Sequence, residues 1–214
     1  MFGKLLSVVL LAGSVLLASA GEVRVEKGIG YRSAVTDDYA GKMCVLDIAV
    51  PEQAAGCPVI VWFHGGGLTS GSRELPQALL NGKNIVVGVE YRLSPKVSTE
   101  QIVDDAAAAV AWTFNNISKY GGDTTAIYVA GHSAGGYLTS MIGLDKSYLE
   151  KYGIDADRIA GLIPFSGQAI THFETRRQQG LDALQPTIDK SAPLYHVRKD
   201  CAPMLIISGD RELE

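Results

Sequence analysis

Residues 131–135 read Gly-His-Ser-Ala-Gly and follow directly on the apolar stretch 126–130. A serine flanked in this way, where a strand runs into a helix, places a hydroxyl at the apex of a sharp turn. The glycines let backbone segments approach a strained residue, and the N-terminal dipole of the following helix favours developing negative charge. Ser133 is therefore the predicted nucleophile of a covalent reaction.

Residues 59–67 form the second candidate, an apolar strand that runs into His-Gly-Gly-Gly. Acyl transfer builds negative charge on the former carbonyl oxygen, which fixed backbone N–H groups stabilise. We expect these donors, the oxyanion hole, to be Gly66, Gly67 and Ala134. The alternatives are a flexible glycine turn and a phosphate-binding loop, but the sequence lacks the Gly-Lys-Ser/Thr and Gly-x-Gly-x-x-Gly spacings of the latter.

Three motifs, at residues 64–67, 91–95 (Tyr-Arg-Leu-Ser-Pro) and 131–136, resemble those of the α/β-hydrolase carboxylesterases. The branch that they resemble contains hormone-sensitive lipase, acetyl and feruloyl esterases and arylformamidases, and the resemblance covers about residues 40–214. His132 stands where hormone-sensitive-lipase-like members often carry aspartate, so the motif is more similar to the feruloyl-esterase and formamidase branches. The resemblance implies a serine hydrolase of acetyl, feruloyl or small aryl esters. An arylformamidase-like amide hydrolase is the alternative, while a prolyl-oligopeptidase-like peptidase is disfavoured because the chain has no room for a propeller domain.

The resemblance also implies a catalytic triad in the chain order serine, acid, histidine. Asp210 follows the apolar segment 204–208 and is the predicted acid, which would orient the histidine and stabilise its charged form. Glu212 and Glu214 are alternatives that lie farther from the strand end. A solvated turn aspartate is the other interpretation of Asp210.

The general base is missing from its expected place. The chain contains four histidines, and all precede the predicted acid: His64, His132, His172 and His196. Because the family pattern puts the histidine after the acid, we expect it beyond residue 214, in a chain that is incomplete at its C-terminus and lacks a final strand and helix. Such a chain should be nearly inactive and prone to aggregate, and a catalytically impaired pseudoenzyme is the non-catalytic alternative. His172, in the irregular stretch 166–203, is a candidate substrate contact, and the alternative is that it replaces the missing base.

Apolar segments rich in β-branched residues alternate with helical patterns, which predicts an α/β-hydrolase fold. We expect a mostly parallel sheet with an antiparallel N-terminal edge and helices on both faces. The first two strands should pair as a hairpin that turns near residues 53–56. Ser98 with Gln101 predicts a capping box that opens a helix to about residue 119. The predicted strands lie at residues 43–50, 58–64, 85–91, 126–130, 159–165 and 204–208.

Residues 1–20 combine Lys4, an apolar run over 5–17 and Ala-Ser-Ala, the outline of a secretory signal peptide. Residues 21–214 then form the hydrolase domain, and we expect a secreted or periplasmic protein. The apolar run is too short for a typical spanning helix, so we expect no stable membrane insertion after cleavage.

The net charge of −4 offers no basic stripe to nucleic acid, so no nucleic-acid partner is expected. The three cysteines show no zinc-binding spacing, and we predict neither a metal nor a cofactor. The expected partner is a small-molecule or polysaccharide-linked ester substrate.

Overall fold

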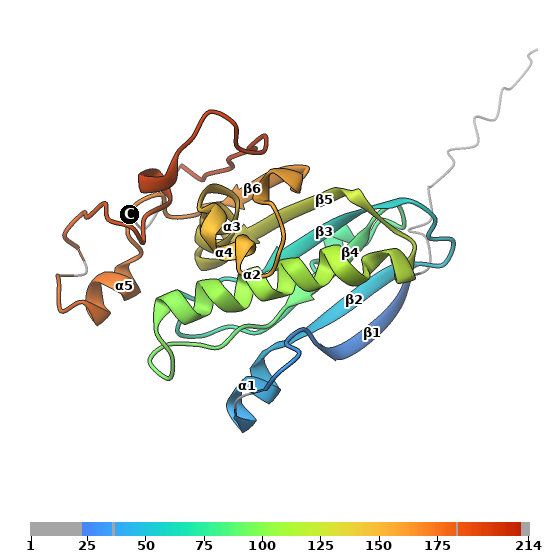
Figure 1. The fold of residues 1–214 in the computed structure, drawn as a ribbon, viewed down its shortest axis with the longest axis horizontal. Helices are drawn as coiled ribbons and strands as arrows, with labels where there is room; N and C mark the ends of the chain where they lie inside the picture. The colour runs from blue at the N-terminus through green and yellow to red at the C-terminus, as the bar shows by residue number, and fades with distance from the viewer. Residues whose placement is uncertain (1–22, 36, 183, 211–214) are drawn as a thin grey trace, which may run out of the picture.

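A computed structural model describes residues 23–35, 37–182 and 184–210 of the chain (Figure 1). Six strands form one sheet in the order β1-β2-β4-β3-β5-β6. Strands β3 to β6 run parallel, and β1 and β2 form an antiparallel edge. The predicted fold class is therefore confirmed. The strands are β1 (Val23–Gly30), β2 (Val45–Pro51), β3 (Cys57–Phe63), β4 (Ile85–Val89), β5 (Gly122–His132) and β6 (Gly161–Phe165).

The predicted hairpin of the first two strands is wrong, because β4 lies between β2 and β3. All five residues of β4 are buried, and the strand pairs antiparallel with β2 on one side and parallel with β3 on the other. The short connection between β2 and β3 thus crosses over a neighbouring strand. Strand β1 was not among the predicted strands; it pairs with β2 at the edge of the sheet.

Among the residues that the structure describes, five α-helices accompany the sheet: α1 (Asp38–Met43), α2 (Thr99–Asn116), α3 (Ala134–Leu144), α4 (Lys146–Glu150) and α5 (Phe173–Gln178). The capping box of α2 is confirmed, with Ser98 Oγ accepting from Gln101 N and Gln101 Oε1 accepting from Ser98 N. The helix passes into a short 3-10 turn that ends at Gly121, whose φ of 81° suits glycine. The predicted helix is thus present with both of its end signals.

Helices α2, α3 and α4 pack against one another on one face of the sheet (Figure 1). Helices on both faces were expected, but in the described part of the chain the opposite face carries the loop between β3 and β4. Glu74 of this loop accepts from Trp62 Nε1 at 3.0 Å, and its backbone lies against Gly88, the register partner of Trp62. Phe165, which contacts the Trp62 ring on this face, stays half-exposed.

After β6, residues 166–203 form an excursion that contains α5, and the chain then returns to the sheet. Met204 and Ile207 bridge to Leu162 and Phe165 in parallel. The segment at 205–207 is exposed although it is apolar. None of the described helices has the length and apolarity that crossing a bilayer requires.

Candidate active site

The turn between β5 and α3 has the geometry of a nucleophile elbow. Ser133 occupies it with φ 55° and ψ −116°, a region that costs a non-glycine residue about 1–3 kcal/mol. Its N–H donates to Phe165 O at 2.8 Å. A Cβ at Gly131 would lie 2.7 Å from Phe63 O, and a Cβ at Gly135 would overlap the same oxygen. Both glycines are required because the backbones of β3, β5 and α3 meet at this turn.

The loop after β3 lies against this elbow. A Cβ on Gly65 would stand 3.4 Å from Ser133 Cβ. Gly66 and Gly67 have φ values of 115° and 63°, which aim their peptide units in directions that other residues rarely adopt. In the described part of the chain, the N–H groups of Gly66, Gly67 and Ala134 have no acceptor. The three predicted oxyanion donors are thus free for a ligand oxygen.

The carbonyl groups of the same peptide units are held in place. Gly66 O belongs to the same peptide unit as the Gly67 N–H, and it accepts a hydrogen bond from Ser70 N at 3.0 Å. Ser133 O belongs to the same peptide unit as the Ala134 N–H, and it accepts a hydrogen bond from Tyr137 N at 3.0 Å. Gly65 O lies 2.7 Å from the side chain of His64. A peptide unit is planar, so a fixed carbonyl also fixes the direction of its N–H.

His64 lies buried beneath this loop. Its ring stacks on Tyr91 with centroids 4.2 Å apart and planes 6° from parallel. Tyr91 donates its O–H to His64 O at 2.8 Å, and burial raises the pKa of Tyr91, which keeps the phenol protonated. His64 Nε2 lies 3.1 Å from Glu90 Oε1. His64 therefore supports the loop rather than facing the nucleophile.

The motif at residues 91–95 fastens β4 to α2. Arg92 donates through Nε and Nη2 to the two carboxylate oxygens of Asp105, at 2.7 and 2.8 Å. The hydrogen bond to Asp105 raises the pKa of Arg92. Arg32 approaches the same fully buried carboxylate. This buried ion pair holds the chain directly after β4, where Tyr91 stacks on His64.

Helix α5 folds back over the loop that precedes α2. Glu174 accepts a hydrogen bond from Ser94 Oγ and two from Arg177, at 2.6 and 2.7 Å. Burial alone would raise the pKa of Glu174, but the bonds from Arg177 and Ser94 outweigh it and lower that pKa. Gln178 Oε1 accepts from Thr99 N at 3.1 Å. These polar contacts dock the excursion onto the start of α2.

The start of α5 places two rings near the oxyanion loop. Phe173 Cζ is 2.8 Å from the position that a Cβ on Gly67 would take, and the fully buried His172 ring packs on Tyr137 and Phe173. Burial lowers the pKa of His172 to about 3, so the ring is neutral at pH 7. Its Nδ1 accepts from Glu174 N at 3.1 Å, which leaves the proton on Nε2.

His172 Nε2 has no hydrogen-bond partner in the described part of the chain. In this tautomer Nε2 is a donor without a lone pair, and it cannot take a proton from Ser133. The arrangement argues against His172 as a substitute base. Its contact with a substrate stays a prediction, because the ring is fully buried in this structure.

Asp210 lies on the side of the sheet where the parallel strands have their carboxyl ends, as the elbow does. It follows the segment that forms two isolated parallel bridges to β6, and it is exposed. No histidine among the described residues bonds to it. The alternatives Glu212 and Glu214 lie outside the described residues.

The two remaining histidines lie elsewhere. His196 Nε2 is 2.8 Å from Lys190 O, within the excursion. His132 ends β5 and is exposed, and its Nδ1 approaches Gly65. The described residues contain no group of three histidine, cysteine, aspartate or glutamate side chains that could hold a metal ion.

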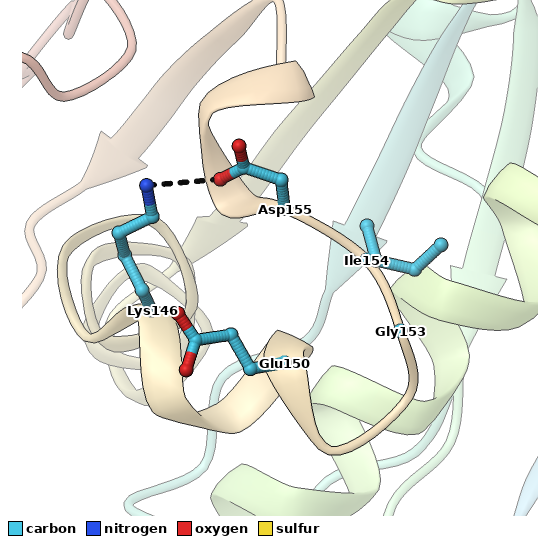
Figure 2. A pocket seen from close by; sticks show the side chains of 5 residues that line it. All are labelled: Lys146, Glu150, Gly153, Ile154 and Asp155. Atoms are coloured by element: carbon cyan, nitrogen blue, oxygen red, sulfur yellow. Dashed lines mark ion pairs between the residues drawn. The ribbon is translucent and has the colours of Figure 1, made fainter.

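A pocket of about 350 Å³ is lined by residues that follow the C-terminal end of α3 (Figure 2). Its lining includes Lys146 and Asp155, whose Nζ and Oδ1 atoms form an ion pair at 3.0 Å. Helix α3 has 11 residues, so at 1.5 Å per residue this cavity begins about 16 Å along the helix from Ser133. It is separate from the candidate active site.

Two groups of functional interest were missed by the sequence analysis. Glu90, which contacts His64, directly follows the buried strand β4, and a carboxylate at the carboxyl end of a parallel strand could have been recognised as a site candidate. No sequence pattern marks Phe173 as a site residue, because it reaches Gly67 only when residues 166–203 fold back over the oxyanion loop.

The sheet order, the elbow and the glycine loop together define an α/β-hydrolase. Residues 46–159, just over half of the chain, match the model of the BD-FAE family. The chain therefore belongs to the BD-FAE family.

Named relatives are esterases. The chain is 37% identical over 90 residues to carboxylesterase NlhH of Mycobacterium tuberculosis, covering 40% of this chain and 28% of the relative. It is 37% identical over 168 residues to esterase LipI of the same organism, covering 76% and 48%. The chain thus spans less than half the length of both relatives.

The fold is also similar to that of a truncated form of a carbohydrate esterase from gut microbiota. The TM-score is 0.73 at 18% identity, with 91% of this chain and 80% of that chain covered. At this identity the likeness supports the fold alone.

Proposed function

We propose that the protein is a serine hydrolase that cleaves carboxylic esters through an acyl-enzyme on Ser133. The observation that carries this proposal is the juxtaposition of a strained, half-buried serine with three N–H groups that lack an acceptor in the described part of the chain. Covalent acyl transfer needs both a nucleophile and fixed donors for the oxygen that becomes negative. The names of the curated relatives, carboxylesterase and esterase, support the same chemistry.

The reaction proceeds in two steps. Ser133 Oγ attacks the ester carbonyl and loses its proton to a general base, while the carbonyl oxygen becomes an oxyanion held by Gly66, Gly67 and Ala134. The intermediate collapses, the C–O bond to the alcohol breaks, and the alcohol leaves with a proton. Water then attacks the acyl-enzyme and releases the acid. Asp210 is the proposed acid of the triad, and a histidine after it stays the predicted base.

The proposed substrates are esters of small acyl groups, either free or attached to polysaccharide. Phe173 stands beside Gly67 and narrows the space at the oxyanion loop, which supports a small group on that side. The resemblance of the sequence motifs to those of feruloyl and acetyl esterases motivates the polysaccharide-linked class. We further propose export of the protein, on the signal-peptide pattern of residues 1–20, which lie outside the described residues.

The test uses the full-length protein, which includes the predicted histidine beyond residue 214, and compares it with its Ser133→Ala variant in p-nitrophenyl acetate hydrolysis and in labelling by a fluorophosphonate probe. The probe reacts with an activated serine without requiring turnover. Ser140→Ala is a matched control, because Ser140 lies on the same helix and bonds to Gly136 O. We expect labelling and hydrolysis in the protein and in Ser140→Ala, and loss of both in Ser133→Ala.

Each other result has a definite meaning. Hydrolysis that survives in Ser133→Ala would contradict the serine mechanism. Labelling of Ser133 without hydrolysis would support the impaired, pseudoenzyme-like alternative. Faster hydrolysis of formanilides than of aryl esters would favour the amide hydrolase.

A further inference from the structure

The first oxyanion donor shares a peptide unit with a carbonyl that a histidine contacts. Gly66 N–H and Gly65 C=O belong to the same planar unit, and His64 Nδ1 lies 2.7 Å from Gly65 O. A hydrogen bond received by the carbonyl polarises the whole unit, and its N–H becomes a stronger donor. Whatever holds His64 in this position therefore acts on the oxyanion hole.

Both ring nitrogens of His64 face hydrogen-bond acceptors. Nδ1 faces the Gly65 carbonyl, and Nε2 lies 3.1 Å from Glu90 Oε1. Tyr91 O–H, 3.4 Å from Nδ1, is committed to His64 O at 2.8 Å. A neutral imidazole has one N–H only, so it would turn a lone pair toward one of the two acceptors. The doubly protonated, positively charged ring satisfies both.

Charged side chains of neighbouring elements also lie around the Glu90–His64 contact. Glu90 Oε2 accepts from Arg73 N at 3.0 Å and lies 3.7 Å from the Arg73 guanidinium. Asp47 in turn pairs with Arg73 at 2.8 Å. Asp47 therefore acts on Arg73, and the carboxylate that contacts His64 itself is that of Glu90. His132, across Gly65, is exposed to solvent.

Glu90 also closes the glycine loop, since it holds His64 at the loop's start and Arg73 near its end. Gly71 lies over the bond between His64 and Gly65, where a Cβ would overlap both Nδ1 and the carbonyl oxygen. The bond is therefore shielded, and charge on the ring acts at short range in a poorly solvated place.

We propose that Glu90 and His64 form a buried ion pair that orients and strengthens the Gly66 N–H as an oxyanion donor. The proposal rests on the proposed function, and both residues are positioning residues that do not touch substrate. Loss of the ring's charge weakens the donor at the moment when negative charge develops, so it lowers kcat and leaves KM nearly unchanged.

The first test does not depend on turnover. ¹⁵N NMR of the labelled protein at pH 7 reports whether each histidine ring is neutral or charged, and the His64→Gln variant assigns the His64 signals. We expect both His64 nitrogens to be protonated. In Glu90→Gln, we expect the ring to become neutral and the Gly66 amide signal to move more than that of Gly67. A neutral His64 ring in the unmodified protein would overturn the proposal, even if Glu90→Gln failed to fold.

The second test is kinetic. Removing an oxyanion donor outright lowers kcat by about 10²–10³, so weakening one should lower it by roughly tenfold. We expect that loss in Glu90→Gln with p-nitrophenyl acetate, together with an altered pH profile of kcat. The matched control is Asp47→Asn, which removes a carboxylate from Arg73 but not from His64, and its kcat should stay within about twofold of the original. Equal losses in both variants would reduce Glu90 to a structural role. Absence of any Ser133-dependent turnover would refute the proposed function, while the state of the His64 ring would still decide this inference.

Discussion

The burial of His172 predicts a measurable dependence of stability on pH. The ring is fully buried and its pKa is lowered to about 3, chiefly by that burial; nearby Glu174 opposes the effect and Arg176 adds to it. In the unfolded chain the same ring has a pKa near 6.5. The perturbation that isolates this effect is His172→Asn, because asparagine also caps a helix start but does not titrate in this range.

The sign follows from the two pKa values of His172. Above pH 6.5 the ring is neutral in both states, and its lowered pKa has no effect on unfolding. Between pH 6.5 and 3 only the unfolded chain takes up the proton, so acid favours unfolding. One pKa unit corresponds to 1.36 kcal/mol, and the ring should therefore remove about 2 kcal/mol from the free energy of unfolding between pH 7 and pH 5.

The assay is urea unfolding followed by circular dichroism at pH 7, 6 and 5. Other groups titrate too, so the difference between the protein and His172→Asn carries the answer. We expect the two unfolding free energies to converge by about 2 kcal/mol as the pH falls to 5. Phe173→Leu changes the neighbouring ring without removing a titrating group, and its offset should be constant. Parallel curves for His172→Asn would refute the argument from burial.

Two further predictions concern close contacts. Gly135→Ala should lower Tm by roughly 3–10 °C, because its Cβ would overlap Phe63 O and overpacking typically costs about 1–3 kcal/mol. The control is Gly30→Ala, whose Cβ would meet nothing within 4 Å and whose Tm should stay near the original value. Differential scanning calorimetry measures both Tm values, and equal shifts in the two variants would contradict the prediction. Phe173→Ala should raise kcat/KM for p-nitrophenyl butyrate by a few fold relative to p-nitrophenyl acetate. The variant opens space beside Gly67, and each additional buried methylene contributes about 0.8 kcal/mol. An unchanged ratio of the two kcat/KM values would show that Phe173 does not line the substrate site.

Local patterns predicted the features that depend on neighbours in sequence. The capping box at Ser98 and Gln101 is present, and the strand, turn and helix around Ser133 have the expected form. In each case the physical cause, a cap or a glycine-lined turn, lies within a few residues. Such causes can be read from one sequence without knowledge of the tertiary structure.

Features that depend on distant residues could not be predicted in this way. The position of β4 between β2 and β3 follows from its pairing with both strands. The sequence of the short connection at residues 52–56 does not indicate that another strand is inserted there. Strand β1 is mostly exposed and shows no clean alternation, so only its pairing with β2 defines it. The contact of Glu174 with Ser94 joins residues 80 positions apart.

The backbone of Ser133 has an evolutionary consequence. At φ 55° and ψ −116° glycine would be relieved of the steric penalty that a side chain suffers. A lineage selected for thermal tolerance alone would therefore drift toward glycine at this site and lose its hydroxyl group. Stabilisation of the protein by random mutagenesis should keep residue 133 fixed by an activity screen, because fold stability and chemistry favour different residues there.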